Sequence, residues 1–181
     1  MTGERITWIE TAQSSDGKLL AFELHLRPGA AVAAEHRHLR QTEDFIVLDG
    51  AIRLEAAGNS RAVDPGQQVT VPTGVAHRWS NVGQHQARVR VELRPALDTE
   101  TFFETFFGLA RDGRTNARGI PGLLQIAVAF RDLRESCPQL VKPPPIMQRG
   151  VFAVLAPIGR LAGRRAIYAK YSPQHPSLTQ Q

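Results

Sequence analysis

The stretch HRHLRQTEDFIVLDG, residues 36–50, decides the fold of this chain and contains most of its chemically informative residues. Successive side chains on a β-strand point to opposite faces, so His36 and His38 project from one face and can bind the same ion. Glu43 precedes the apolar run FIVL, which ends in the Asp-Gly pair typical of a hairpin turn. The pattern therefore predicts antiparallel strands that carry two imidazoles and one carboxylate.

A second stretch, GQQVTVPTGVAHRWSN at residues 66–81, predicts another strand followed by a turn. The Pro-Thr-Gly turn after this strand would direct His77 back toward the first two histidines. The combined set of three imidazoles and one carboxylate suits a divalent transition ion such as Fe, Mn, Ni, Cu or Zn. We therefore predict a metal site whose ligands are His36, His38, Glu43 and His77.

Both stretches resemble the two sequence motifs of the cupin family. The first motif reads here as His36-x-His38, four residues, Glu43, six residues and Gly50. The second reads as Gly66, five residues, Pro72-x-Gly74, two residues, His77, three residues and Asn81. The resemblance covers about residues 17–97, with one departure, since Gly29 stands one residue farther from His36 than usual. It implies a mainly β fold, an antiparallel jelly-roll β-barrel over residues 1–98, with the same four residues as ligands of an internal metal.

Three apolar residues share strand faces with the predicted ligands. Phe45 and Val47 alternate with Glu43 along one strand, and Trp79 lies two residues after His77 on another. We expect these three side chains to line a partly aromatic substrate pocket beside the metal. The glycines, proline and asparagine of the two motifs are interpreted as turn residues and not as catalysts.

Composition and length exclude several classes of protein. The chain has 181 residues, which fits one domain with room for an extension. Its single cysteine, Cys137, excludes an internal disulfide and a cysteine metal cluster. The N-terminus lacks the apolar core of a signal peptide, and no run of about 20 apolar residues is present. We therefore expect a cytoplasmic protein without a membrane-spanning helix.

Residues 99–181 are expected to form a helical extension. Phenylalanines with i, i+3 and i+4 spacing predict a first helix over about residues 99–113. Two further helices are predicted, over about residues 121–135 and 146–163, on either side of three consecutive prolines. The aromatic stripe of the first helix is expected to pack on the barrel or on a second subunit, and we expect a homodimer.

The extension is also basic. The chain carries a net charge of +5, and no acidic residue follows Glu135. Six basic residues lie beyond that point, namely Lys142, Arg149, Arg160, Arg164, Arg165 and Lys170. The apolar segment 150–159 between two of these arginines is compatible with a helix that lies in an anionic membrane surface. Nucleic acid is not expected as a partner, because no recognition helix or aromatic interleaving accompanies the charge.

Two classes of function stay open. The first is a metal-dependent enzyme that acts on a small organic molecule, with an Fe-dependent dioxygenase or related oxidoreductase favoured. In that class Glu43 is also the catalytic residue, because it is the one carboxylate of the set and can accept a substrate proton. Metal-dependent isomerases and decarboxylases keep the same ligands, whereas the three-histidine thiol dioxygenases lack the glutamate. The second class is a non-catalytic, metal-dependent barrel that binds a small ligand or senses it.

Overall fold

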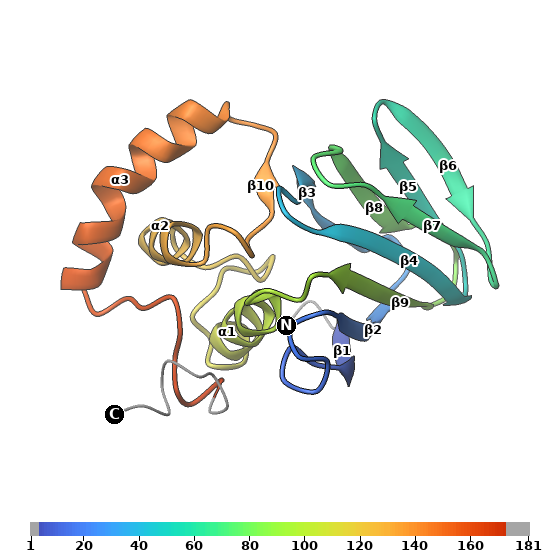
Figure 1. Cartoon of the computed structure of the whole chain (residues 1–181), viewed down its shortest axis with the longest axis horizontal. Helices are drawn as coiled ribbons and strands as arrows, with labels where there is room; N and C mark the ends of the chain where they lie inside the picture. Colours follow the sequence, from blue (N-terminus) through green and yellow to red (C-terminus); the bar gives the residue numbers. More distant parts are fainter. Residues whose placement is uncertain (1–3, 173–181) are drawn as a thin grey trace. The chain divides into compact units, whose positions relative to one another are not determined.

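The structure is a computed structural model that describes residues 4–172, apart from the side chains of residues 32 and 33. Over these residues the chain forms ten strands and three helices (Figure 1). It divides into two compact units, one with residues 4–97 and 138–142 and the other with residues 98–137 and 143–172. Residues 173–181 of the predicted extension lie outside the described residues.

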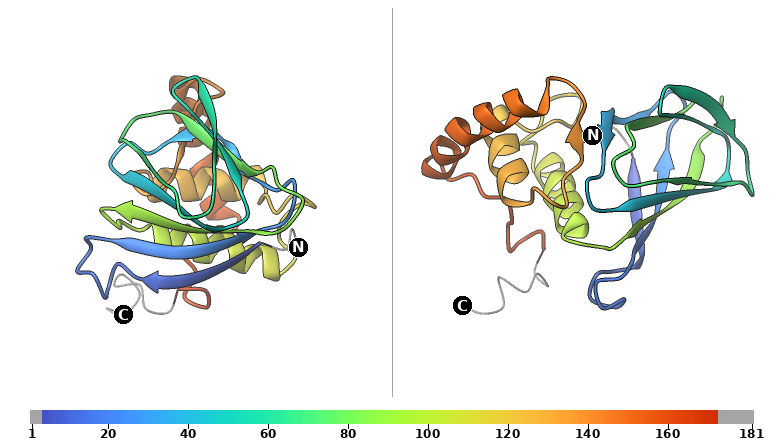
Figure 2. Two further views of the ribbon diagram at one scale, coloured as in Figure 1. Left: turned by 90° about the vertical axis from the view of Figure 1, so that its right-hand side faces the viewer. Right: turned by 45° about the horizontal axis from the view of Figure 1, so that its top comes forward.

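The first unit consists of two five-stranded antiparallel sheets. The first sheet has the order β1-β2-β9-β4-β7, and the second has the order β10-β3-β8-β5-β6. Figure 2 shows the strands of the two sheets on opposite sides of a common interior. The strands are β1 Arg5–Glu10, β2 Leu20–Leu26, β3 Ala31–Arg37, β4 Thr42–Asp49, β5 Ile52–Ala56, β6 Asn59–Val63, β7 Gln68–Val71, β8 His77–Asn81, β9 Ala87–Arg94 and β10 Gln139–Leu140.

The interior is built by alternation of apolar and polar residues along the strands. On β9, Val89, Val91 and Leu93 are buried, whereas Arg88 before them and Arg94 after them are exposed, and Arg90 between the two valines is half-buried. Such alternation is typical of an antiparallel sheet with one face on the core and one face in solvent. The remaining core residues of the two sheets include Leu20, Phe22, Leu24, Phe45, Val47, Ile52, Leu54 and Trp79. The mainly β character predicted from the sequence is confirmed.

The turn between β4 and β5 requires glycine at position 50. Gly50 has a φ of +71°, a backbone conformation that L side chains rarely adopt. A Cβ atom at this position would lie 2.9 Å from the Cα atom of Ala87 and 2.9 Å from the carbonyl oxygen of Gln86. The prediction of a hairpin from the Asp-Gly pair is wrong, because β4 pairs with β7 and β9 in one sheet, whereas β5 pairs with β6 and β8 in the other. The turn instead carries the chain from one sheet to the other and packs directly against the start of β9.

The second unit contains α1 (Thr99–Arg111), α2 (Leu123–Asp132) and α3 (Pro145–Leu161). These helices occupy the three segments predicted from the sequence, with small differences at their ends. Phe102, Val128, Leu133 and other buried residues form the apolar core of this unit. Helices α2 and α3 approach closely at Gly159, where an added Cβ would lie 2.8 Å from the carbonyl oxygen of Leu124. No helix among the described residues combines the length and hydropathy needed to cross a membrane.

Strand β10 is not predicted by the sequence analysis, which expects only helices after residue 98. Its two residues, Gln139 and Leu140, pair with Arg37 and His36 of β3. The Arg37 Nε–H also donates a 2.9 Å hydrogen bond to Oε1 of Gln139. The C-terminal half of the chain thus supplies the edge strand of the sheet that carries the first predicted metal ligand.

Candidate metal centre

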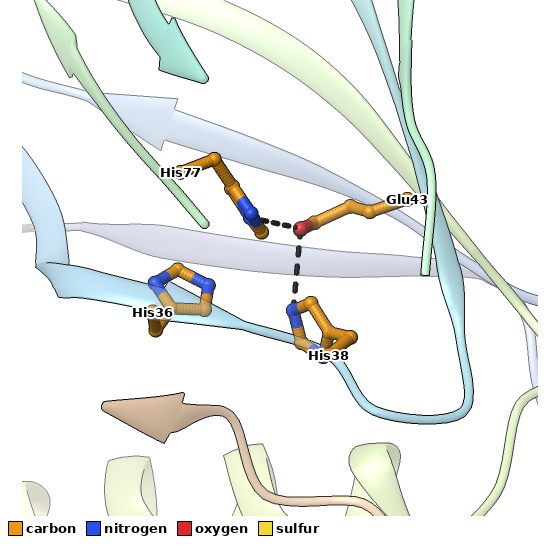
Figure 3. Close-up of side chains that lie close together, drawn as sticks. All are labelled: His36, His38, Glu43 and His77. Atoms are coloured by element: carbon orange, nitrogen blue, oxygen red, sulfur yellow. Dashed lines mark hydrogen bonds and ion pairs between the residues drawn. The ribbon is translucent and has the colours of Figure 1, made fainter. Parts of the chain in front are cut away.

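The four residues predicted as metal ligands converge in the interior of the first unit (Figure 3). Each offers one ligand atom, and these atoms all lie within 4.8 Å of one another. All four side chains are buried, with exposed fractions between 1 % for His77 and 7 % for His38. Buried imidazoles and a buried carboxylate are costly to desolvate unless they are paired or bind a metal, so this cluster is a candidate functional site.

Two different sheets bring the ligands together. His36 on β3 lies opposite His77 on β8 in the register of one sheet, and His38 follows the end of β3. Glu43 is on β4, which belongs to the other sheet. Two imidazoles from one sheet, and a third just beyond the end of its strand β3, therefore meet a carboxylate from the sheet that faces it.

Two of the imidazole rings are held by backbone carbonyl groups. Nδ1 of His36 lies 3.0 Å from the carbonyl oxygen of Ala34, and Nδ1 of His77 lies 3.0 Å from that of Val75. A carbonyl oxygen only accepts a hydrogen bond, so Nδ1 must carry the proton in both rings. This leaves the Nε2 lone pairs available to a metal when the rings are neutral, the arrangement that commonly orients histidine ligands.

The Glu43 carboxylate makes the shortest contacts in the site. Its Oε2 atom lies 2.8 Å from Nε2 of His77 and 3.2 Å from Nε2 of His38 (Figure 3). Neighbouring donors on one ion, at bond lengths of about 2.1 Å, are about 3.0 Å apart in an octahedron and about 3.4 Å apart in a tetrahedron. The observed separations are therefore close to those that a shared ion needs.

Electrostatics separates the roles of the ionisable groups. Burial would raise the pKa of Glu43, but hydrogen bonds with His38 and His77 outweigh burial and hold this pKa well below its usual range. Burial would lower the pKa of His77, but the hydrogen bond with Glu43 outweighs it, so the pKa is raised. Burial dominates for His36 and lowers its pKa to about 4. At neutral pH, Glu43 is thus ionised and His36 is neutral, the protonation states that metal ligands require.

The donors present fit a divalent transition ion. Donors on opposite sides of an octahedral ion are about 4.2 Å apart. The four ligand atoms here all lie within 4.8 Å of one another, so no pair would need to approach by more than roughly 0.6 Å to bind one ion. Nδ1 of His38 is buried and has no hydrogen-bond partner among the described residues. Its ring therefore lacks the carbonyl contact that holds the other two, and it is the ligand with the greatest freedom to adjust.

The three residues predicted to line a substrate pocket lie in the same interior. Phe45 and Val47 are fully buried on β4, and Trp79 is buried on β8. The ring centroid of Phe45 lies 5.1 Å from that of Trp79 and 6.1 Å from that of His77. The predicted sharing of faces is confirmed, because these rings point inward with the ligands. That a substrate contacts them remains a prediction.

Two contacts that support the ligands are not predicted from the sequence. Gln41, which is 1 % exposed, donates hydrogen bonds to the carbonyl oxygens of Pro95 and Ala96 and thereby anchors the segment between His38 and Glu43. The backbone N–H of Gly74 donates a 2.8 Å hydrogen bond to the carbonyl oxygen of His38, which ties the two sequence motifs together. In the sequence, only the polar character of Gln41, between the ligands His38 and Glu43, could have pointed to its hydrogen bonds with Pro95 and Ala96.

Comparison with known proteins assigns this unit to a family. Residues 22–93 match the family model of the cupin domain. The polyketide synthase CurC of Streptomyces cyaneus is 30 % identical over 70 residues, which are 39 % of this chain and 45 % of that protein, so the chain spans less than half of this curated relative.

Solved structures with a similar fold include KdgF from Halomonas sp., with a TM-score of 0.47, 21 % identity and coverage of 52 % of this chain and 81 % of the other. A predicted oxalate decarboxylase from Thermotoga maritima has a TM-score of 0.48, 19 % identity and coverage of 52 % and 86 %. The family match contains all four candidate ligands, and residues 22–93 of the chain are therefore a cupin domain.

Proposed function

We propose that the protein is a metal-dependent enzyme that acts on a small organic molecule, with dioxygenase or related oxidoreductase chemistry as the first candidate. The observation that carries this proposal is the buried group of His36, His38, Glu43 and His77, which would hold the ion. A divalent ion bound there would supply Lewis acidity and, if it is a redox metal such as Fe, the capacity to activate oxygen. Four protein ligands leave room in a six-coordinate shell for a substrate.

The chain's own residues supply orientation and proton transfer. Carbonyl groups fix the rings of His36 and His77, so these two donors need little rearrangement to act together. Glu43 is ionised and is the one carboxylate among the four, so we assign it a second role as the acceptor of a substrate proton. Its pKa is low because of the two histidine contacts, and a carboxylate that turns from them toward a substrate becomes a stronger base.

The strand order supports the proposal that the two sheets form a jelly-roll barrel. Omitting the edge strands β1 and β10, the sheets pair strands 2-9-4-7 and 3-8-5-6. Each strand from β2 to β9 thus alternates between sheets except at the β5–β6 hairpin, as a double Greek key requires. Such a barrel would enclose the ligands and separate a bound substrate from bulk water.

We further propose an aromatic or polyketide-derived substrate. Phe45 and Trp79 offer aromatic surface in the same interior as His77. Aromatic side chains of this kind favour flat apolar ligands over strongly charged ones. The name of the relative CurC, a polyketide synthase protein, agrees with this choice, although the likeness covers only 70 residues.

Metal analysis followed by oxygen uptake tests the proposal. Plasma mass spectrometry of the purified protein is expected to find close to one Fe, Mn, Ni, Cu or Zn per chain, lost in His77→Ala. The exposed His85 provides the matched control, and His85→Ala is expected to keep the metal. Protein that binds no metal after reconstitution would contradict the proposal.

The metal-loaded protein then separates the functional classes. Oxygen consumption with an aromatic, keto-acid or polyketide-derived substrate would support the dioxygenase. Product formed without oxygen consumption would favour a metal-dependent isomerase or decarboxylase, which the same donors also suit. Tight substrate binding without any turnover would favour a sensory or ligand-binding protein.

A further inference from the structure

Helix α3 presents an apolar face to solvent. Its large apolar residues with exposed fractions between 40 % and 91 % are Ile146, Met147, Val151, Val154, Ile158 and Leu161. The other exposed positions of the helix are two arginines and the small or imino residues Gly150, Ala153 and Pro157. No exposed position of this helix carries a serine, threonine, amide or carboxylate. This composition is that of a covered surface, because solvated helix faces are normally charged or polar.

The exposed face is distinct from the face that packs in the helical unit. Gln148, Ala156 and Gly159 are the buried residues of α3, and Gly159 lies against the backbone of α2. Figure 1 shows α3 beside α2. From Met147 onward the exposed apolar residues follow at intervals of four, three, four and three residues, which places them in one stripe on the side away from this contact.

Positive charge borders this apolar face on one side. Arg149 and Arg160 lie at one edge of it, and Arg164 and Arg165 follow the end of the helix. No acidic residue occurs in α3 or anywhere after it in the sequence. Arg160 pairs with Asp132 of α2, while Arg149 and Arg165 are exposed. The partner that complements this surface therefore has an apolar region with anionic groups beside it.

We propose that α3 docks on the surface of an anionic membrane, with its apolar stripe at the boundary of the acyl chains and its arginines among the headgroups. The helix spans 17 residues and lies in the interface instead of crossing the bilayer. The inference is independent of the proposed function, because it uses no residue of the candidate metal centre.

A second copy of the chain fits the same face less well. Neither α3 nor the segment after it offers a carboxylate to the exposed Arg149 and Arg165 of another copy. Anionic lipid headgroups supply the negative charge that this part of the chain lacks.

Vesicle co-sedimentation of the full-length protein tests the proposal. Wild-type protein is expected to bind vesicles that contain phosphatidylglycerol and to lose binding as salt is raised. Arg149→Gln combined with Arg165→Gln should weaken binding about 25-fold, since each basic residue near an anionic surface contributes about fivefold, or about 1 kcal/mol. Val154→Glu combined with Ile158→Glu should weaken it at least about tenfold.

Matched variants in the first unit provide the controls. Ile9→Glu combined with Val82→Glu changes two apolar residues that are 46 % and 45 % exposed, and Arg53→Gln combined with Arg61→Gln removes two exposed charges. Both controls are expected to bind like wild type, with circular dichroism confirming that all variants are folded. Equal binding to neutral phosphatidylcholine vesicles, or no binding to either kind, would overturn the proposal.

Sedimentation velocity identifies the competing partner. If the wild-type protein is a dimer that does not bind vesicles, and Val154→Glu combined with Ile158→Glu converts it to a monomer, then a second copy covers the stripe. This result would also overturn membrane docking. A protein that sediments as the same species with and without these substitutions, and that binds anionic vesicles, supports it.

Discussion

Oε2 of Glu43 lies 2.8 Å from Nε2 of His77, although the two residues belong to strands of different sheets. The contact forms only when the sheets face each other, so the site reports on the assembly of the whole β unit. A metal ion could replace this hydrogen bond with little movement, because the two atoms are already about as far apart as neighbouring donor atoms on one ion.

Replacement of Glu43 by glutamine tests the charge of this carboxylate. Glu43→Gln keeps the size of the side chain but removes the negative charge that offsets the ion, so Zn²⁺ affinity should fall at least about tenfold. Isothermal titration with Zn²⁺ measures the change. Glu55→Gln, at a partly exposed carboxylate paired with Arg78, is the matched control and should bind Zn²⁺ as wild type does. Unchanged affinity in Glu43→Gln would remove this residue from the ligand set.

Protonation of His36 should contribute to the pH dependence of the free energy of unfolding. Its pKa is about 4 in the folded protein and about 6.5 when unfolded, so the unfolded chain takes up the proton first as pH falls. His36 therefore destabilises the ion-free protein progressively between pH 6.5 and 4, by on the order of 3 kcal/mol in total. His77 has a raised pKa and acts in the opposite sense, since the stability it contributes is present below pH 6.5 and lost as pH rises through its folded pKa.

A comparison of wild type with His36→Gln isolates the first effect. Urea unfolding in the presence of chelator, repeated from pH 7.5 to 4.5, should show the variant gaining stability relative to wild type as the pH decreases. Glu43 contributes little to the difference in this window, because its lowered pKa matters only as pH falls below the ordinary glutamate value of 4.5. A constant difference across the pH range would contradict the assignment of a neutral, buried His36.

Gly50 and Gly58 separate backbone strain from steric clash. Both have a positive φ, +71° and +79°, but only Gly50 has backbone atoms where a Cβ would lie. Gly58→Ala should therefore cost about 1–2 kcal/mol for the left-handed conformation alone. Gly50→Ala should cost roughly 1–3 kcal/mol more, because the β4–β5 turn must move away from β9. Chemical denaturation measures the loss in free energy of unfolding for each variant. Equal losses would show that the β4–β5 turn can move away from β9 at no additional cost.

Gln41 is expected to act on the metal through position alone. Gln41→Leu leaves the carbonyl groups of Pro95 and Ala96 without these donors and should cost about 1–3 kcal/mol of stability. Because Gln41 anchors the segment between His38 and Glu43, Zn²⁺ affinity should also fall, by roughly tenfold. The number of Zn²⁺ ions bound at saturation should stay the same, since no ligand is removed. A loss of stability with unchanged affinity would limit Gln41 to a structural role.

The ligand set and the inward faces of its strands could be predicted because both depend on local spacing. A two-residue interval places His36 and His38 on one face, and strict alternation places Phe45 with Glu43. Strand β10 could not be predicted, because two residues have no periodicity and their pairing with β3 joins positions about 100 residues apart in the sequence. The role of Gln41 likewise depends on a distant loop, which spacing alone does not reveal.

The return of the chain to β3 sets a limit on how the protein can be divided. Residues 138–142 follow two helices and yet belong to the β unit, where Leu140 pairs with His36. A chain cut after residue 98, at the apparent end of the cupin domain, would remove β10 and leave the backbone groups of β3 on that edge unpaired beside a metal ligand, while the other edge of β3 stays paired with β8. Open edges of this kind recruit strands from other molecules. The shortened protein is therefore expected to aggregate, whereas one that ends after residue 142 keeps the edge sealed.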